Sequence, residues 1–278
     1  MQPITHTGKV ILAAAGPGDP DLLTVKALKY LQKADVVLTD RLVSPAIIDD
    51  MVNPIAEVIY VGKQCRKGAS TPQATINELM VYYAQQNKLV VRLKGGDVSI
   101  FSNILDELQT LVEHYIPYEI IPGVTSALGA AAYSGIPLTA RNYSTAVRFL
   151  TYYKSDVVTE SYWKELAQTD DTLVFYMSAE TLSGVVQHLL ENNISNDKQL
   201  AIIEQATTPL QNIYTCALPD FKKQYGAKKF LSPSIVIIGK VVALHQQFGW
   251  FVNSHSATEY FKPVEGRLVS YSEKAKTA

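Results

Sequence analysis

Residues 89–108 read LVVRLKGGDVSIFSNILDEL, and this stretch decides the fold class. Its first residues form a largely apolar run that predicts a buried β-strand, and the residues after the glycines have the spacing of a helix. The glycine pair Gly95-Gly96 between them allows a tight turn or the close approach of another group to the backbone. A strand, a glycine turn and a helix in this order are the repeating unit of a parallel α/β sheet.

Four more segments of the first half are short, apolar and separated by helical patterns. They read KVILAAAG at 9–16, VVLTD at 36–40, EVIYVGK at 57–63 and YEIIPG at 118–123. Near-continuous Val, Ile and Leu runs are typical of strands that are covered on both faces. We therefore expect a mostly parallel sheet with helices on both sides.

The stretch SGIPLTARNYS at 134–144 interrupts this alternation with glycine, proline and asparagine. We predict an N-terminal α/β domain over 1–137, a second α/β domain over 145–251 and a polar tail over 252–278. The pair QLAIIEQATTPLQNIYTCAL at 199–218 leaves only a short turn between two strands, which predicts antiparallel pairing. The second sheet should therefore be mixed.

The composition excludes several classes of protein. Among 278 residues, 47% are hydrophobic and the net charge is -1, which argues against a general nucleic-acid binder. The two cysteines, Cys65 and Cys216, do not have metal-ligand spacing, so we expect a reducing compartment and no metal. The N-terminal residues lack the apolar core of a signal peptide, and no apolar run has the length of a membrane span. A cytoplasmic protein without a membrane partner is the expectation.

Three glycine-bearing turns follow predicted strands. The first, GPGDPD at 16–21, lacks the third glycine of the dinucleotide fingerprint, and its aspartates would repel a pyrophosphate. KGGD at 94–97 and PGVTS at 122–126 are the other two. Each alone is compatible with an ordinary turn, with Asp21 or Ser126 as a helix cap. Because α/β sheets bind ligands at the carboxyl ends of their strands, the three together favour a site for a neutral or cationic small molecule.

A set of motifs then occurs in order along the chain: GPGDPDLLTVKAL, DVVLTDRLVS, VVRLKGGD, PGVTSALGAAAYSGIPLT, TLVFYM, ATTP and IVIIGKVV. With these motifs the chain resembles the tetrapyrrole methylase superfamily from about residue 8 to residue 251. DRLVS, RLKGGD and SGIPLT make it most similar to the uroporphyrinogen-III C-methyltransferase branch. The resemblance implies two α/β domains with a ligand cleft between them, usually in a homodimer.

The resemblance also implies S-adenosylmethionine as the cofactor, with S-adenosylhomocysteine as its product. Asp97 would meet the polar end of the cofactor, and Met177 and Ala206 would lie near the adenosine. Core packing is the alternative for Met177. The implied cofactor contacts are Pro17, Gly95, Gly96, Asp97, Ile100, Thr125, Ser126, Met177 and Ala206.

The implied reaction is methylation of uroporphyrinogen III at C2 and then at C7, which gives precorrin-2 for sirohaem or cobalamin. A pyrrole carbon attacks the sulfonium methyl group, so positioning in a water-poor site supplies most of the rate. One proton must then leave the macrocycle, and the resemblance places the base at Asp40 and a proton donor at Lys63. The alternatives are a strand-ending residue for Asp40 and a partner of a substrate carboxylate for Lys63.

The substrate carries many carboxylates, which arginine binds well through its forked guanidinium. Arg148 and Lys154 are more simply explained as solvated surface charges. The candidate basic contacts are Arg41, Arg66, Lys67 and Arg141.

The chain departs from the family pattern directly after Asp97. Relatives usually continue with Pro-Phe-x-Phe-Gly-Arg-Gly-Gly, whereas this chain reads VSIFSNIL at 98–105, so Asn103 replaces an arginine expected to meet the substrate. Ile100, Ile104 and Leu108 have i, i+4, i+8 spacing, which predicts that the helix begins early, with Ser99 as a plausible cap. We expect Asn103 to hydrogen-bond a substrate carboxylate.

Three other functions remain open. The first is a tetrapyrrole methyltransferase that acts at a different ring position, which product analysis would distinguish. The second is a catalytically weak regulator that binds the tetrapyrrole or the cofactor, with the altered loop as its signature. A dinucleotide-binding reductase is a distant third, because Asp21 stands where its fingerprint requires glycine.

Overall fold

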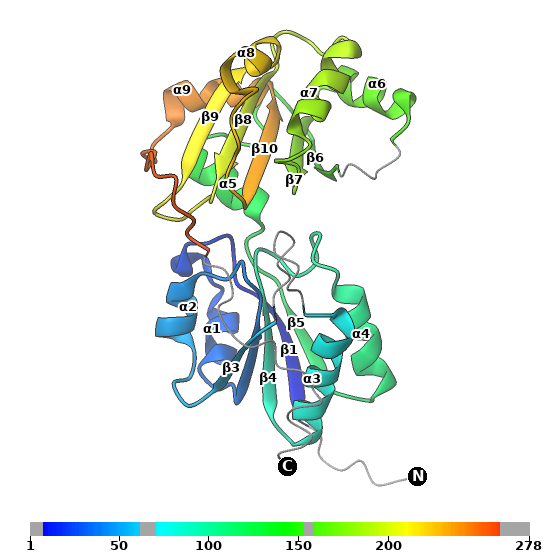
Figure 1. The fold of residues 1–278 in the computed structure, drawn as a ribbon, viewed down its shortest axis with the longest axis vertical. Helices are drawn as coiled ribbons and strands as arrows, with labels where there is room; N and C mark the ends of the chain where they lie inside the picture. The colour runs from blue at the N-terminus through cyan, green and yellow to red at the C-terminus, as the bar shows by residue number, and fades with distance from the viewer. Residues whose placement is uncertain (1–7, 62–70, 153–157, 262–278) are drawn as a thin grey trace. The chain divides into compact units, whose positions relative to one another are not determined.

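The computed structural model describes residues 8–61, 71–152 and 158–261, and within it the chain forms two compact units (Figure 1). The first comprises the residues up to Thr125 together with Phe261, and the second runs from Ser126 to Tyr260. The sequence predicts a first domain that extends to residue 137, whereas the compact unit ends at Thr125. Helix α5 (Ser126–Ser134) therefore belongs to the second unit.

The first unit contains a five-stranded sheet with the strand order β3-β2-β4-β1-β5, and every pair of neighbouring strands is parallel. The predicted parallel sheet is confirmed. Its strands are β1 (Lys9–Ala14), β2 (Val36–Thr39), β3 (Glu57–Tyr60), β4 (Leu89–Lys94) and β5 (Tyr118–Ile121).

Helices cover both faces of this sheet, as Figure 1 shows. Helices α1 (Val25–Leu31) and α2 (Pro45–Met51) pack with the alternate strand residues that include Ile11 and Val37. Helices α3 (Gln73–Gln85) and α4 (Ile104–Glu113) pack on the opposite face. Because both faces are buried, β1, β2 and β4 need apolar residues at successive positions, which explains their continuous Val, Ile and Leu runs.

The second unit contains a mixed five-stranded sheet with the order β6-β7-β10-β8-β9. Strands β6 and β7 are parallel, and the other three neighbouring pairs, including the predicted pair β8–β9, are antiparallel. Both the mixed sheet and this hairpin are therefore confirmed. The strands are β6 (Val147–Thr151), β7 (Thr172–Tyr176), β8 (Gln199–Glu204), β9 (Asn212–Ala217) and β10 (Ser234–Gly239).

One face of the second sheet carries a large apolar core. Helices α6 (Glu160–Gln168), α7 (Leu182–Glu191) and α8 (Phe221–Tyr225) cover it, with the short 3-10 helix η2 (Leu218–Asp220). Helix α5 lies against β10. After β10 the chain continues through the 3-10 helix η3 (Lys240–Leu244) into α9 (His245–Phe248).

One local expectation is wrong, and the alternative of a helix cap at Asp21 does not apply. Helix α4 begins at Ile104, not near Ser99, because Phe101 and Asn103 adopt left-handed φ angles of 52° and 51° that an α-helix cannot contain. Asp21 is not the helix cap either. Asp19 caps a 3-10 turn, η1 (Pro20–Leu22), by accepting a hydrogen bond from the backbone of Asp21, and Thr24 caps α1.

The segment 253–260, which the sequence predicts as part of a polar tail, is bound to the second unit through side-chain amides. Asn212 accepts a hydrogen bond from the backbone of His255 at 2.8 Å and donates to the carbonyl of Ser256 at 3.0 Å. Gln205 contacts the backbone of Thr258 and Tyr260 in the same way. These contacts explain why the segment is polar, although it is held against the fold.

Candidate functional site at the carboxyl edge of the parallel sheet

The first two glycine turns meet at the carboxyl edge of the first sheet. Gly16, after β1, and Gly96, after β4, exchange two backbone hydrogen bonds, at 3.1 and 2.8 Å. Both have positive φ angles, 77° and 70°, which only glycine adopts without strain. Pro17 is buried next to this bridge. The sequence prediction that these turns share one edge is therefore confirmed for this pair.

Two further glycines at this edge are explained by close packing. A Cβ atom on Gly95 would lie 2.7 Å from the carbonyl oxygen of Leu42, in the loop after β2. A Cβ atom on Gly123 would lie 2.6 Å from the Cβ of Ala14. The fold alone therefore requires glycine at both positions, independently of any ligand.

Asp97 is a buried carboxylate that joins two turns. Its Oδ1 accepts hydrogen bonds from the backbone and the hydroxyl of Ser99, at 2.8 and 2.5 Å, and its Oδ2 accepts one from the backbone of Gly123 at 2.9 Å. Burial raises the pKa of the Asp97 carboxyl, but these hydrogen bonds outweigh it and hold the pKa below its usual value. These hydrogen bonds favour the ionised form of the carboxylate, which is oriented by Ser99, a residue of the altered loop.

Asp40 lies at the end of β2 and is held by an arginine of the neighbouring strand. Its Oδ1 accepts a hydrogen bond from Nη2 of Arg92 at 2.6 Å. The other terminal nitrogen of Arg92 donates to the carbonyl oxygens of Leu38 and Leu93, both at 3.2 Å. The Asp40 side chain is 28% exposed, whereas that of Arg92 is only 3% exposed.

Behind this pair lies a fully buried carboxylate, Glu107 of α4. Its two oxygens accept hydrogen bonds from Nε of Arg92 at 2.9 Å and from Nζ of Lys94 at 2.8 Å. Burial lowers the pKa of the Lys94 ammonium, and the nearby charge of Arg92 adds to this effect. Burial also opposes the charge of Arg92, but Asp40 and Glu107 outweigh it and raise the pKa of the guanidinium. We call these four side chains the buried charge network.

The altered loop after Asp97 is held by hydrogen bonds of its own side chains. Val98 is buried, and its carbonyl accepts a hydrogen bond from the hydroxyl of Ser102. Ile100 is half-buried, while Asn103 is exposed and its side chain makes no capping hydrogen bond to α4. The predicted substrate contact at Asn103 is therefore accessible.

The structure places nine of the predicted site residues in the first unit, at or just beyond its strand ends. Arg41 is half-buried beside Asp40, and Thr125 is buried four residues after β5. Among the residues that the structure describes, Arg41 has no salt-bridge partner. The nine are Pro17, Asp40, Arg41, Gly95, Gly96, Asp97, Ile100, Asn103 and Thr125.

The remaining described candidates lie in the second unit. Ser126 is the first residue of α5, Ala206 is buried after β8, and Arg141 is exposed. Met177 follows β7 with a left-handed φ of 54°, and 51% of it is exposed, so it is not a core residue. Lys63, Arg66 and Lys67, together with Lys154, lie outside the described residues.

Sequence reasoning missed the part of the buried charge network that lies behind Asp40. The signal was present, because Arg92 and Lys94 are charged residues inside an otherwise apolar strand. Lys and Arg are rarely fully buried unless they are paired, so each predicts a buried acidic partner. Glu107 could not be identified as that partner, since it lies on a separate helix, 15 residues beyond Arg92.

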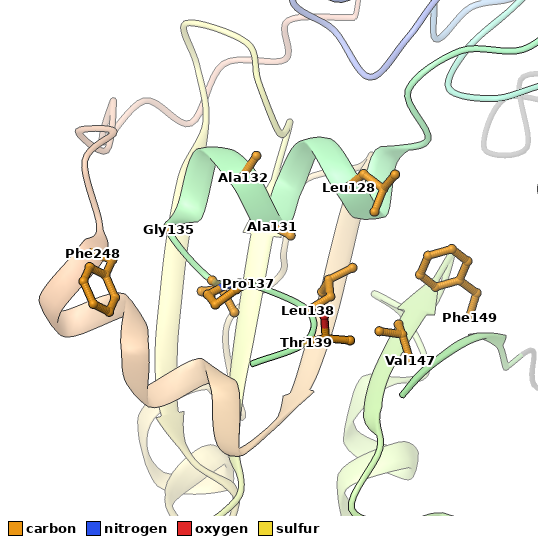
Figure 2. Close-up of a pocket in the computed structure, with 11 residues that line it drawn as sticks. Leu128, Ala131, Ala132, Gly135, Pro137, Leu138, Thr139, Val147, Phe149 and Phe248 are labelled. Carbon is orange, nitrogen blue, oxygen red and sulfur yellow. The ribbon is translucent and has the colours of Figure 1, made fainter. Parts of the chain in front are cut away.

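The second unit also has an apolar hollow of about 640 Å³. Leu128 of α5, Val147 and Phe149 of β6, and Phe248 of α9 line it, with the segment 135–139 between them (Figure 2). The side chains that line it are almost all apolar, and none of them is acidic or basic.

The acidic side chains at the carboxyl edge disfavour a pyrophosphate ligand. Asp19 and Asp40 are both partly exposed there, and their carboxylates would repel its phosphate groups. Within the described ranges, no group of three or more His, Cys, Asp or Glu side chains has a geometry that could hold a metal ion. Nor does any helix within these ranges combine the length and the hydropathy that a membrane span needs.

Comparison with known proteins identifies relatives along most of the chain. The chain is 44% identical over 255 residues to a siroheme synthase of Pseudomonas putida, covering 92% of this chain and 55% of the relative. A siroheme synthase of Nitrosomonas europaea is also 44% identical, over 248 residues, covering 88% of this chain and 51% of the relative. The chain therefore spans about half the length of these relatives.

Solved structures with the same fold match over nearly their whole length. A uroporphyrin-III C-methyltransferase of Thermus thermophilus has a TM-score of 0.71 and 32% identity, covering 87% of this chain and 96% of that one. The same enzyme complexed with S-adenosylhomocysteine has a TM-score of 0.69 and 33% identity, covering 85% and 100%. A cobalt precorrin-4 methyltransferase has a TM-score of 0.74 and 28% identity, covering 84% and 95%.

The family model for tetrapyrrole (corrin/porphyrin) methylases matches residues 9–222, which include most of both sheets. With the parallel first sheet, the mixed second sheet and these relatives, the chain belongs to the tetrapyrrole methylase family.

Proposed function

We propose that the chain transfers methyl groups from S-adenosylmethionine to C2 and C7 of uroporphyrinogen III, giving precorrin-2 for sirohaem synthesis. The observation that carries this proposal is the similarity, over 96 to 100% of their length, to two structures of uroporphyrin-III C-methyltransferase. The similarity to siroheme synthases supports the sirohaem branch. When bound, the cofactor supplies an activated methyl group on a positively charged sulfur.

The described residues support this chemistry from the first unit. The bridge between Gly16 and Gly96 and the ordered carboxylate of Asp97 form a rigid edge that would orient the cofactor. Rigid positioning is the main contribution a protein makes to such a transfer. In the second unit, Met177 and Ala206 are the residues proposed to meet the adenosine. S-adenosylhomocysteine should therefore raise the melting temperature of the chain by mass action.

The proton released from the methylated macrocycle needs an acceptor, and Asp40 is the proposed base. It is a carboxylate with one oxygen held by Arg92 and with part of its surface exposed. Lys63 is the proposed proton donor. For the substrate carboxylates we propose contacts with Arg41, Asn103 and Arg141 and, outside the described residues, with Arg66 and Lys67.

An anaerobic assay with uroporphyrinogen III and S-adenosylmethionine tests the proposal, read as precorrin-2 absorbance and product mass. Asp40→Asn should retain affinity for S-adenosylhomocysteine and slow turnover on the order of 10²-fold, the usual scale of acid–base catalysis. If the wild-type chain binds S-adenosylhomocysteine and uroporphyrinogen III without turnover, a regulatory role replaces the enzymatic one.

A second candidate is methylation of a different tetrapyrrole. The cobalt precorrin-4 methyltransferase superposes with a slightly higher TM-score than the uroporphyrin enzyme, 0.74 against 0.71, and the substrate loop at 98–105 departs from the usual pattern. Its identity is lower, however, at 28% against 32%. Product NMR that shows methylation at another carbon would favour this candidate.

We also propose a cytoplasmic homodimer. The free, buried thiol of Cys216 is consistent with a reducing compartment. The apolar hollow beside Leu128 and Phe149 is the proposed subunit contact, because β6 is an edge strand and apolar hollows of this kind often form interfaces. Leu128→Glu should convert dimers to monomers in sedimentation analysis. Ile55→Glu, at an exposed apolar residue of the first unit, should have no such effect.

A further inference from the structure

The guanidinium of Arg92 is fixed at every nitrogen atom. Nε donates to Glu107, one terminal nitrogen donates to the carbonyls of Leu38 and Leu93, and the other donates to Asp40. The side chain is 3% exposed, so water cannot replace these partners. The arginine therefore cannot rotate away from Asp40 without leaving a buried donor unsatisfied, which is costly.

The charges around Arg92 are balanced. The buried charge network contains two cations, Arg92 and Lys94, and two carboxylates, Glu107 and Asp40. Glu107 is fully buried, and each of its two oxygens binds one of the two cations. Lys94 therefore secures Glu107, and Glu107 in turn secures Arg92.

Only the outer member of the network reaches the surface. Oδ1 of Asp40 is occupied by Arg92, and no described residue donates a hydrogen bond to its Oδ2. A carboxylate held by one oxygen presents the other in a fixed direction. Such a geometry is what a base needs when it must meet one particular proton of a bound substrate.

We propose that Arg92 is a positioning residue for the methyl-transfer reaction, which acts by orienting Asp40 and is itself fixed by Glu107 and Lys94. The inference rests on the proposed function, since it assigns Arg92 a role only through the proposed base. A merely structural role for Arg92 would instead affect the fold and cofactor binding, whatever residue stands at position 40.

A double-mutant cycle between Arg92→Lys and Asp40→Asn tests the inference. Methyl transfer is measured anaerobically in a single turnover with enzyme in excess, and affinity for S-adenosylhomocysteine is measured by calorimetry. Lysine keeps the charge but cannot span both carboxylates, so Arg92→Lys should slow transfer on the order of 10- to 100-fold. In the Asp40→Asn background the same change should cost less than about twofold, with cofactor affinity unchanged in both.

Two further variants control the cycle. Lys94→Met leaves the contact between Arg92 and Glu107 in place and substitutes for Arg92→Lys if that protein fails to fold; its smaller effect should likewise disappear in the Asp40→Asn background. Arg148→Lys, in a surface ion pair of the second unit, should leave the rate unchanged.

The outcomes separate the inference from the function on which it rests. An equal loss in both backgrounds, or a parallel loss of cofactor affinity, would overturn the positioning role while the function stands. A wild-type chain that does not methylate uroporphyrinogen III would remove the proposed function and the inference with it.

Discussion

Two arginines, one in each unit, bridge two carboxylates each. Arg92 in β4 contacts Asp40 at 2.6 Å and Glu107 at 2.9 Å, and its side chain is 3% exposed. Arg148 in β6 makes two similar contacts, at 2.6 and 2.5 Å, but its side chain is 31% exposed. The ion pairs have the same chemistry and nearly the same lengths, but Arg92 is far less exposed to water than Arg148 and also donates to two backbone carbonyls.

This difference in exposure decides how much each group of ion pairs contributes to the stability of the fold. In water, a broken ion pair is replaced by hydration, so an exposed pair adds little to stability. In the buried charge network, removing one partner leaves an uncompensated charge away from water, and this costs far more than the ion pair itself contributes to stability. The buried cluster therefore suits a group that must not move, whereas the exposed one tolerates change.

The largest expected effect is at the centre of the buried cluster. Glu107→Ala leaves Arg92 and Lys94 as neighbouring buried cations, so it should lower the free energy of unfolding by about 3 to 5 kcal/mol. Urea denaturation measures this loss. Glu165→Ala, which removes a 57% exposed partner of Arg148, is the matched control and should cost less than about 1 kcal/mol. Equal losses would mean that burial is not the deciding variable.

A smaller loss is expected at Lys94. Lys94→Met keeps the length of the side chain, and Glu107 retains its contact with Arg92. Loss of one hydrogen bond to a charged group should cost about 2 kcal/mol by urea denaturation. If Lys94→Met lowered the free energy of unfolding as much as Glu107→Ala, the contact between Arg92 and Glu107 would not suffice to stabilise the buried carboxylate, and this prediction would be wrong.

Disrupting a buried hydrogen-bond network of uncharged groups should cost less stability than disrupting the cluster around Arg92 and more than disrupting the cluster around Arg148. Asn212 is almost fully buried and binds the backbone of His255 and Ser256 through its amide. Asn212→Ala leaves neutral backbone groups unpaired and should cost about 1 to 2 kcal/mol. Asn196→Ala, at an exposed position, should have almost no effect in the same urea titration.

The sheets could be predicted from the sequence because their signal is local. The residues of β1 and β10 are mostly apolar, so burial on both faces can be read from each strand alone. The glycine turns at 16–18 and 94–97 were also visible, since glycine adopts positive φ angles without strain. Their shared edge then followed from the parallel order of the strands.

The features that the sequence did not predict depend on non-local contacts or on backbone conformation. The apolar spacing of Ile100, Ile104 and Leu108 predicts a helix that begins early. Spacing does not reveal that Asn103 adopts a left-handed conformation, which prevents the helix from beginning before Ile104. The partners of Arg92 come from a different strand and a helix. The segment 253–260 looks like a solvated tail because its polar contacts are with residues 40 to 55 positions earlier.

The smallest expected loss of stability is at the exposed ion pairs of Arg148. The pH dependence of this loss tests separately whether it arises from charge. The hydrogen bond from Arg148 is the main cause that lowers the pKa of Asp171 in the folded chain. A carboxyl whose folded pKa is lowered adds stability above its ordinary pKa of about 4 and loses it as the pH falls through the folded value. Arg148→Ala should therefore lower the melting temperature at pH 7 by only about 1 to 2 °C. This difference from wild type should shrink as the pH falls below about 4, and also in about 1 M salt, because exposed charges are screened. A difference that persisted in acid and at high salt would mean that Arg148 contributes through packing, and the contrast with Arg92 would no longer rest on burial of charge.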